Sequence, residues 1–379
     1  MKITIATGPL LPVPALRGGA IPRMWHGLAG EFARRGHEVC IFARRYPGQT
    51  NEEIRGGVRY LRVGGFEQGR WLALDLLKDF AYASTSLWRL PDADVLITND
   101  FWLPAFAARL RQRAGRVVVN ANRFPKGQYF LYGGAARIAA ASSAVRDATV
   151  AQTPGLKDRI RVFPNPVDTG IMSPDENAKA TDPRLLLYVG RLHPEKGVHL
   201  LAAAFSRIAP RHPGWRLRIV GPWELEEGGG GQAYVQGLRA MLKGVPAEIA
   251  DPQFNPALLA EEYRSATLFC YPSLADQGES FGLAALEAMA CGVPPLVSSL
   301  ECFRDFVSDG QTGWVFDHRG MDPEGALAGA LESAMADPGR ALELGRRAST
   351  AALKFGYAEV AEGYLADFRQ LLGTGAHNA

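Results

Sequence analysis

The sequence predicts an α/β protein made of two Rossmann-like, doubly wound domains. In both halves, short apolar segments alternate with amphipathic ones, the pattern of strands and helices around parallel sheets. The length of 379 residues suits two domains better than one. A polar stretch, residues 173–183, separates the halves and is expected to be the linker.

The first half begins with a short apolar strand and a helix over residues 21–35 that ends at Gly36, a typical C-terminal signal. In the second half, two regular strands end at Gly190 and Gly221, where the chain must turn. Ligands of doubly wound domains bind at the carboxyl ends of such strands. The expected strands are 3–7, 38–43, 58–63, 95–98, 117–120 and 148–151 in the first half, and 185–189, 216–220, 247–249, 267–271, 295–298 and 313–316 in the second.

The composition excludes several classes of protein. No run approaches the roughly 20 apolar residues that cross a bilayer, and the start lacks the apolar region of a signal peptide. We therefore expect a cytoplasmic protein. The four cysteines show no C-x-x-C spacing and have apolar neighbours, so buried thiols are expected. The histidines show no metal-ligand spacing, and we expect no metal site.

Positive charge is concentrated in the first half. Residues 1–165 carry 24 Lys and Arg against 12 Asp and Glu, a net charge of +12, and the remainder carries −9. This asymmetry indicates an anionic partner, although a solvated helix face also explains it. No nucleic-acid motif accompanies the charge, so nucleic acid is not expected. Peripheral contact with an acidic membrane surface would involve Arg109, Arg111, Arg113 and Arg116.

The segment 268–292 predicts a strand, a polar loop and a helix over residues 283–290. The start of that helix offers backbone N–H groups and a positive dipole end to a phosphate. Glu279 lies just before the helix and Glu287 lies in its second turn, so one carboxylate can face a sugar while the other reaches the hydroxyls of a ribose. An ordinary strand, loop and helix with solvated glutamates is the alternative. The amides that would hold the phosphate belong to Ser280, Phe281, Gly282 and Leu283.

Two further segments follow strands. In residues 190–197, Gly190 and Gly197 frame Arg191 and Lys196. These two cations are expected to be exposed at the mouth of the cleft that two such domains leave between them. Such cations stabilise a departing diphosphate where no metal does so, unless both are ordinary surface charges. Gly18-Gly19 opens the first helix and suits backbone contact with a phosphate or sugar, although a plain turn explains it equally well.

Together these segments resemble the retaining GT-B glycosyltransferases of family four. The shared marks are the Gly18-Gly19 turn, N-P-V-D at 165–168, G-R-L-x-x-x-K-G at 190–197, and the pair Glu279 and Glu287. Their order also agrees, so the resemblance covers essentially the whole chain. It implies two domains facing each other across a cleft: residues 1–166, joined by 357–379 crossing back through a terminal helix, and residues 167–356.

The resemblance also implies roles for the motif residues. Arg191 and Lys196 would bind the donor diphosphate, Glu287 the ribose and Glu279 the transferred hexose. Gly18 and Gly19 would close over the phosphates, and Gly221-Pro222 would lie near the nucleobase. The anomeric configuration would be kept through front-face attack, with Glu279 positioning the sugar and not forming a covalent bond to it.

One departure from the family concerns the first domain. Many relatives carry a histidine after the strand near residue 119, close to the transferred sugar, whereas this chain has Asn120, Asn122 and Arg123 around that position. Any of these could supply the polar contact. Asn99 and Asp100, after the strand 95–98, are further acceptor-side candidates, with loop capping as the alternative.

The expected function is transfer of a hexose from a UDP- or GDP-sugar to a hydroxyl of a glycan, a lipid-linked molecule or a small molecule. The nucleotide-diphosphate sugar is a co-substrate, and no cofactor or metal is expected. A UDP-sugar 2-epimerase is one alternative, and a non-catalytic envelope or coat protein with the same fold is another.

Overall fold

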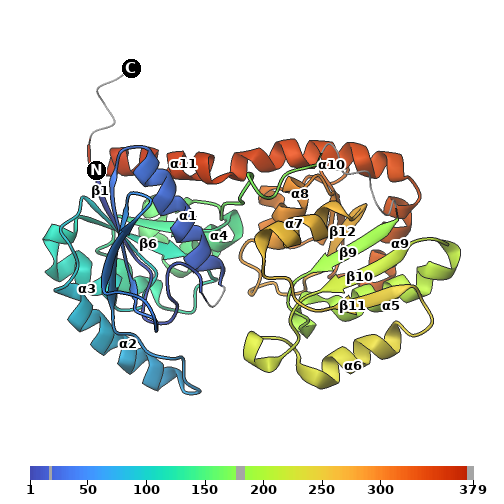
Figure 1. Ribbon diagram of the computed structural model, residues 1–379, viewed down its shortest axis with the longest axis horizontal. Coiled ribbons are helices and arrows are strands. Elements are labelled where there is room, and N and C mark those ends of the chain that lie inside the picture. The colour runs from blue at the N-terminus through green and yellow to red at the C-terminus, as the bar shows by residue number, and fades with distance from the viewer. Residues whose placement is uncertain (17–18, 176–183, 374–379) are drawn as a thin grey trace. The chain divides into compact units, whose positions relative to one another are not determined.

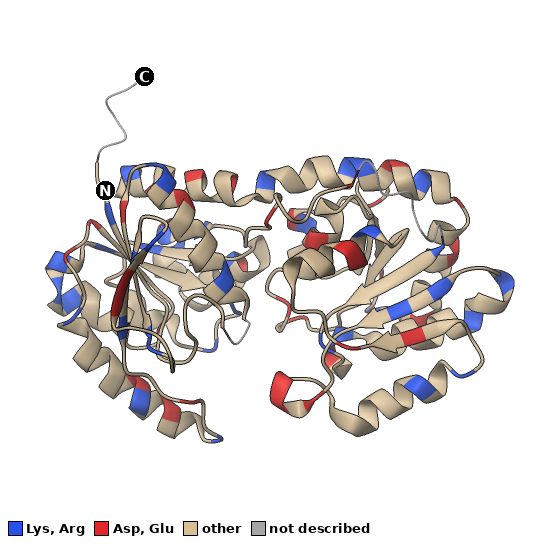
Figure 2. Ribbon diagram, viewed as in Figure 1, with Lys and Arg blue, Asp and Glu red and all other residues tan. Residues whose placement is uncertain are grey.

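The computed structural model describes residues 1–16, 19–175 and 184–373. The chain forms two compact units (Figure 1). Unit 1 comprises Met1–Pro166 together with the C-terminal segment that begins at Tyr357, and unit 2 comprises Val167–Gly356. Unit 1 contains 25 Lys and Arg against 15 Asp and Glu, so its net charge is +10 and that of unit 2 is −7 (Figure 2).

The described part of unit 1 contains an eight-stranded sheet in the order β3-β4-β2-β1-β5-β6-β7-β8. Neighbouring strands are parallel except for β3 and β4, which pair antiparallel. The strands are β1 (Lys2–Ala6), β2 (Glu38–Arg44), β3 (Glu52–Arg55), β4 (Val58–Val63), β5 (Val95–Thr98), β6 (Arg116–Ala121), β7 (Arg137–Ala140) and β8 (Ile160–Val162).

Helices cover both faces of this sheet because its strands bury alternate residues on opposite sides. Val95 and Ile97 of β5 join one core cluster with residues of α1 and α11, whereas Leu96 joins a second cluster with residues of α2, α3 and α4. The α-helices described in unit 1 are α1 (Ala20–Arg34), α2 (Leu72–Leu87), α3 (Leu103–Leu110), α4 (Ser143–Gln152) and α11 (Tyr357–Leu371).

Unit 2 holds a six-stranded, wholly parallel sheet in the order β11-β10-β9-β12-β13-β14 within the residues that the structure describes. Its strands are β9 (Leu185–Val189), β10 (Arg216–Val220), β11 (Ala247–Ala250), β12 (Leu268–Tyr271), β13 (Pro295–Ser298) and β14 (Trp314–Phe316). Its α-helices are α5 (Val198–Ile208), α6 (Gly231–Met241), α7 (Pro256–Arg264), α8 (Leu283–Ala290), α9 (Pro323–Met335) and α10 (Pro338–Ala352).

The predicted fold class is confirmed, and one predicted strand is wrong. Residues 148–151 belong to helix α4, not to a strand. The side chain of Ser142 accepts a hydrogen bond from the amide of Val145 and caps this helix (3.2 Å). A short apolar run cannot by itself distinguish a helix from a strand, and here the cap three residues before Val145 decides for the helix.

Three strands of unit 1 were not predicted. The edge strand β3 reads Glu-Glu-Ile-Arg, and only one of its residues is apolar. In β7, two alanines follow Arg137 and Ile138, and alanine is a poor strand former. Strand β8 is only three residues long. Each strand is defined by its pairing with a neighbour, which a single segment of sequence does not reveal.

The cysteines match their prediction, because Cys40, Cys270, Cys291 and Cys302 are all buried and unpaired with one another. Burial raises the pKa of the Cys40 thiol to about 12. Within the described ranges, no helix has the length and apolar character needed to traverse a membrane.

Candidate functional site

The loops that follow β9 and β10 are joined at the carboxyl ends of these strands. The amide of Gly190 donates to the carbonyl of Val220 (3.0 Å), and the amide of Leu192 donates to the carbonyl of Pro222 (2.8 Å). Both Gly190 and Gly221 have φ of 153°, a conformation that favours glycine. A Cβ at Gly221 would also collide with the Gly190 carbonyl. The structure thus brings three of the predicted donor-side residues together.

A buried ion pair links the loop after β9 to the loop after β12. Nζ of Lys196 lies 2.7 Å from Oε2 of Glu279, and the two side chains are only 8% and 9% exposed. The amide of Leu274 donates to the carbonyl of Glu195 (2.8 Å), which holds the two loops against each other. The expectation that Lys196 is an exposed cation is therefore wrong, because the loop after β12 packs over it.

Two stacked tyrosine rings lie next to this ion pair. The rings of Tyr188 and Tyr271 are 5.8 Å apart and nearly parallel, and Nζ of Lys196 lies 5.7 Å from the centre of the Tyr271 ring. Burial and the nearby Glu279 carboxylate both raise the pKa of each tyrosine well above its usual value. Both hydroxyls therefore stay neutral, and Lys196 lies over a neutral aromatic surface.

Arg191 is held in place by its own segment and by Gly228 in the segment that follows β10. Its guanidinium donates to the carbonyl of Gly228 (2.6 Å) and to Oε1 of Glu195 (2.7 Å). The hydroxyl of Tyr188 donates to the Arg191 carbonyl (2.9 Å). The Arg191 side chain remains 41% exposed, so its cationic end is both oriented and accessible.

Helix α8 starts at a tight glycine turn over an aromatic core. Gly282 has φ of 81° and caps the helix, and a Cβ there would collide with the ring of Phe303. Phe281 is buried against Phe306, with ring centres 5.2 Å apart. Phe281 can therefore serve a ligand only through its backbone. The first amides of a helix have no acceptor within it. Of the four predicted anion-binding amides, that of Leu283 begins α8 and that of Gly282 belongs to its cap, whereas those of Ser280 and Phe281 lie in the loop just before the helix.

Glu287 lies on α8 and is oriented by a tyrosine of α7. The hydroxyl of Tyr263 donates to Oε2 of Glu287 (3.0 Å), and both residues are buried. Solvated glutamates, the alternative interpretation of this segment, do not describe Glu279 or Glu287. Each carboxylate is held by a partner at a fixed place on the carboxyl side of the unit 2 sheet.

Two ion pairs account for most of the charges in the site. Lys196 is paired with Glu279 and Arg191 with Glu195, whereas the third carboxylate, Glu287, accepts from the neutral hydroxyl of Tyr263. The positive end of the α8 dipole adds to these charges. In the described portions of the chain, no three His, Cys, Asp or Glu side chains converge as metal ligands would.

The glycine turn predicted in unit 1 is only partly visible. Gly18 lies outside the described residues. Gly19 has φ of 99° and directly precedes α1 as its capping residue. It therefore occupies a turn at the start of a helix, as expected, at the carboxyl end of the first strand and its loop.

Asn99 and Asp100 follow β5 and differ in their surroundings. Oδ1 of Asn99 accepts from Nε1 of Trp25 (3.1 Å), and its Nδ2 donates to the carbonyl of Ala6 (3.4 Å). Asn99 therefore ties three elements of unit 1 together. Asp100 is buried, and neither of its carboxyl oxygens has a hydrogen-bond partner among the described residues. Burial, reinforced by Asp79, raises the pKa of Asp100 well above its usual value.

The polar residues at the end of β6 and just after it differ in their surroundings. Nδ2 of Asn120, within β6, donates to the hydroxyl of Tyr364 on α11 (3.5 Å), and its Oδ1 is buried without a partner among the described residues. Oδ1 of Asn122 is buried and has no partner in the described ranges, whereas Arg123 is exposed. Asp100 and Asn122 therefore have unused hydrogen-bonding capacity at the ends of adjacent strands.

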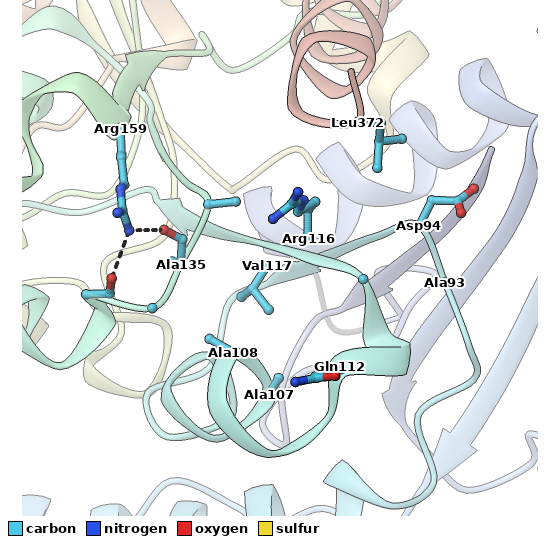
Figure 3. Close-up of a pocket in the computed structure, with 14 residues that line it drawn as sticks. Ala93, Asp94, Ala107, Ala108, Gln112, Arg116, Val117, Ala135, Arg159 and Leu372 are labelled. Atoms are coloured by element: carbon cyan, nitrogen blue, oxygen red, sulfur yellow. Dashed lines mark hydrogen bonds between the residues drawn. The ribbon is translucent and has the colours of Figure 1, made fainter. Parts of the chain in front are cut away.

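A pocket of about 780 Å³ lies in unit 1, away from all of these residues (Figure 3). Two residues of its lining lie at strand starts: Asp94 directly precedes β5, and Arg116 is the first residue of β6. The guanidinium of Arg159, also in the lining, donates to the carbonyls of Gly133 and Ala135. The pocket is at the amino ends of the strands, opposite the edge where doubly wound sheets bind ligands. It contains none of the predicted site residues.

Sequence reasoning missed the partners that orient the site. Tyr188 and Tyr271 stand at the carboxyl ends of correctly predicted strands, and that position could have revealed them. Glu195 lies inside the 190–197 motif, four residues after Arg191, a spacing typical of ion pairs. Tyr263 lies on a helix of ordinary composition and has no sequence signal.

Comparison with solved structures identifies the fold. The chain aligns over 98% of its length with a sucrose-phosphate synthase from Thermosynechococcus elongatus (TM-score 0.78, 22% identity, 99% of that chain). It aligns equally far with Anabaena Alr3699/HepE in complex with UDP and glucose (TM-score 0.71, 16% identity, 100% of that chain). At these identities the likeness concerns the fold, which is GT-B.

Two family descriptions match the sequence, one in each unit. "Glycosyltransferase Family 4" matches residues 21–170, and "Glycosyl transferases group 1" matches residues 172–354. The two matches together span most of the chain. The chain belongs to the family-four, group 1 glycosyltransferases.

Several D-inositol 3-phosphate glycosyltransferases are similar in sequence. That of Acidothermus cellulolyticus is 37% identical over 229 residues, which is 57% of this chain and 49% of the relative. That of Segniliparus rotundus is 34% identical over 228 residues, or 58% and 48% of the two chains. The chain thus spans about half the length of these relatives.

Proposed function

We propose that this protein is a retaining hexosyltransferase that uses a UDP- or GDP-sugar as donor and needs no metal ion. The observation that carries the proposal is the buried pair of Lys196 and Glu279 next to the start of α8. Burying two charges is costly unless each has a partner. A site that retains such a pair beside free helix amides is suited to an anionic ligand that carries hydroxyl groups.

The donor diphosphate is the anion that fits this site. Amides at the start of α8 supply neutral donors, and Lys196 has further N–H donors beyond the one directed at Glu279. Arg191 is fixed at the end of β9 by Glu195 and Gly228. As the bond to the sugar breaks, negative charge grows on the diphosphate, and these two cations stabilise it there. They would take the place of the metal ion used by other nucleotide-sugar enzymes.

The two carboxylates bind the two sugar rings of the donor. Glu287, oriented by Tyr263, accepts from the ribose hydroxyls, and Glu279 accepts from a hydroxyl of the hexose. Glu279 is already bound to Lys196, which favours positioning of the sugar over nucleophilic attack by this carboxylate. The acceptor then attacks the sugar on the same face from which the diphosphate leaves, so the anomeric configuration is kept.

The acceptor is proposed from the relatives and from unit 1. Because the similar proteins are named D-inositol 3-phosphate glycosyltransferases, a cyclic polyol or its phosphate is the first acceptor to examine. Asp100 and Asn122 offer hydrogen-bonding atoms without partners in the described residues, at the carboxyl ends of adjacent strands. Such atoms suit the hydroxyl groups of a polyol.

The decisive experiment combines binding with product analysis. Thermal unfolding of the purified chain is followed with UDP, GDP and ADP, because a ligand of the folded state raises the melting temperature. The stabilising nucleotide is then supplied as its glucose, galactose or mannose donor, with inositol phosphate, glycerol or a lipid-linked sugar as acceptor. Proton NMR of the product distinguishes retention from inversion.

The same experiment separates the alternatives. A 2-epimerase converts the donor without any acceptor, and a non-catalytic coat protein leaves the donor unchanged. Lys243→Ala removes an exposed lysine of unit 2 and serves as the control for substitution of Lys196. If neither UDP nor GDP raises the melting temperature, the proposal fails.

A further inference from the structure

Helix α2 of unit 1 exposes large apolar side chains on its outer side. We define the α2 apolar face as Trp71, Leu72, Leu74, Leu77, Phe80 and Trp88, each between 48% and 73% exposed. No other α-helix in the described ranges carries more than one exposed large apolar residue. A soluble surface rarely gathers so many apolar residues unless it meets a partner.

The spacing places Leu74, Leu77 and Trp88 on the side of the helix opposite its buried residues, with Trp71 and Phe80 at the two edges of that side. Leu72 is the exception, because it lies on the same side of the helix as the buried Ala83. Phe80 packs edge-on against Trp102, with ring centres 5.6 Å apart, and so fixes the face against the neighbouring helix α3. Figure 1 shows α2 on the outside of unit 1 beside α3.

Polar groups on the exposed side of α2 are satisfied within the helix. The hydroxyl of Ser84 donates to the carbonyl of Phe80 (2.8 Å), and that of Thr85 donates to the carbonyl of Ala81 (3.0 Å). Nζ of Lys78 lies 3.5 Å from Oδ1 of Asp75, so these two charged side chains form an ion pair. The helix is mostly tan in Figure 2, with its charged residues near the N-terminal end. It therefore presents few groups that require water.

We propose that the α2 apolar face inserts into the headgroup region of an anionic lipid bilayer. Trp71 and Trp88 stand at the two ends of the helix, and tryptophan is the residue that favours the membrane–water interface. Arg70 and Arg89 are exposed next to them and can reach lipid phosphates. The net charge of +10 on unit 1 attracts an acidic surface and opposes pairing with a second copy of the same face.

This surface differs from the one expected from the sequence. The sequence pointed to four arginines at positions 109, 111, 113 and 116. Arg109 donates to the carbonyls of Ala105 and Leu131. Arg111 donates to the carbonyl of Leu90 and to the carboxylate of Asp92. Hydrogen bonds within unit 1 thus occupy these guanidinium groups. The apolar residues of α2 supply the insertion, and the overall positive charge of unit 1 supplies the attraction.

Flotation of the purified full chain with vesicles tests the proposal. One set of vesicles is phosphatidylcholine alone, and the other contains phosphatidylglycerol in addition. We expect the chain to float with the second set, and Leu74→Glu/Leu77→Glu to reduce the bound fraction at least tenfold. Leu342→Glu, at an exposed leucine of α10 in unit 2, is the matched control and should bind as the unchanged chain does.

Two measurements keep the outcome interpretable. Circular dichroism and the melting temperature must be the same for both variants and the unchanged chain, because all three leucines are exposed. Sedimentation velocity without lipid reports self-association. Equal flotation of the double variant, equal flotation with neutral vesicles, or a dimer that the double variant abolishes in a chain that binds no vesicles would each overturn the proposal.

Discussion

The ammonium of Lys196 lies 2.7 Å from a carboxylate oxygen of Glu279, although 83 residues separate them in the chain. The contact joins the loop after β9 to the residue that precedes the α8 turn. It makes the two motifs interdependent, because removing either charge leaves the other buried without its partner. Two predictions of binding and stability depend on this coupling.

Lys196→Met should weaken both folding and binding. Leaving Glu279 buried without its cation costs about 3–5 kcal/mol of unfolding free energy. Loss of a charge-assisted hydrogen bond to the diphosphate should weaken nucleotide binding roughly 10- to 100-fold. Urea unfolding and calorimetric titration with UDP or GDP measure the two effects separately.

The double variant Lys196→Met/Glu279→Gln separates these effects. Because it buries no unpaired charge, it should regain most of the stability that the single variant loses. It should not regain nucleotide affinity. Full recovery of affinity in the double variant would show that Lys196 acts only through Glu279.

Tyr263→Phe should reduce recognition of the ribose. The substitution removes the hydroxyl that orients Glu287, and a lost buried hydrogen bond costs about 1–3 kcal/mol. The preference for UDP or GDP over its 2′-deoxy analogue should therefore shrink. Tyr234→Phe, whose hydroxyl contacts His199 instead, is the control and should keep that preference. An unchanged preference in both variants would argue against Glu287 as the ribose ligand.

Gly282→Ala and Gly237→Ala should change stability in opposite directions. At Gly282, φ of 81° and the ring of Phe303 oppose any side chain, at a cost of about 1–3 kcal/mol. At Gly237, in the interior of α6, a Cβ meets nothing within 4 Å, and alanine should gain up to about 1 kcal/mol. Thermal unfolding checks both signs, and a destabilised Gly237→Ala chain would contradict this account of α6.

The stability of unit 1 should fall as the pH rises above the ordinary range of carboxyl groups. Burial raises the pKa of Asp79 and Asp100 in the folded chain, so the folded state holds protons that the unfolded state has released. Each pKa unit of difference is worth about 1.4 kcal/mol. The stabilisation from these protons is fully present below the pKa of the carboxyl groups in the unfolded chain. It is lost as the pH rises through their higher pKa in the folded chain.

Asp100→Asn should abolish much of this dependence and stabilise the chain at neutral pH. Urea unfolding over a pH series measures the change, with Asp158→Asn, an exposed carboxylate, as the control. A flat profile for the unchanged chain would mean that Asp100 is ionised when folded.

Chelation of metal ions by EDTA should leave sugar transfer unchanged, because Arg191 and Lys196 are proposed to stabilise the departing diphosphate without a metal. Initial rates with EDTA and with added Mg²⁺ should agree within about twofold. Inactivation by EDTA that Mg²⁺ reverses would contradict the metal-free part of the proposal.

The sequence predicted most of the sheets because their strands carry local signals. The segments Val58–Val63 and Val95–Thr98 combine β-branched or apolar residues with sharp polar boundaries, and both agree with the structure to the residue. Strand β7 has no such signal and exists through its pairing with β6 and β8. Residues 148–151 form a helix because of a cap outside the apolar run.

The candidate site was predictable in its parts but not in its contacts. Motif spacing placed Arg191, Lys196, Glu279 and Glu287 at the ends of strands and at a helix start. It could not show that Lys196 is buried, because this depends on a loop far along the chain. The orienting hydroxyl of Tyr263 comes from another helix, and tertiary packing alone sets that contact.

The C-terminal helix gives the two units different histories during synthesis. Unit 2 is one continuous stretch of chain, whereas Tyr364 and Phe368 of α11 complete the unit 1 core around Trp25 and Phe32. On the ribosome, residues 1–166 are therefore made long before their last packing partner emerges. Until then Trp25 and Phe32 lack their aromatic neighbours, so unit 2 can finish folding first and unit 1 must wait, exposed to chaperones and proteases.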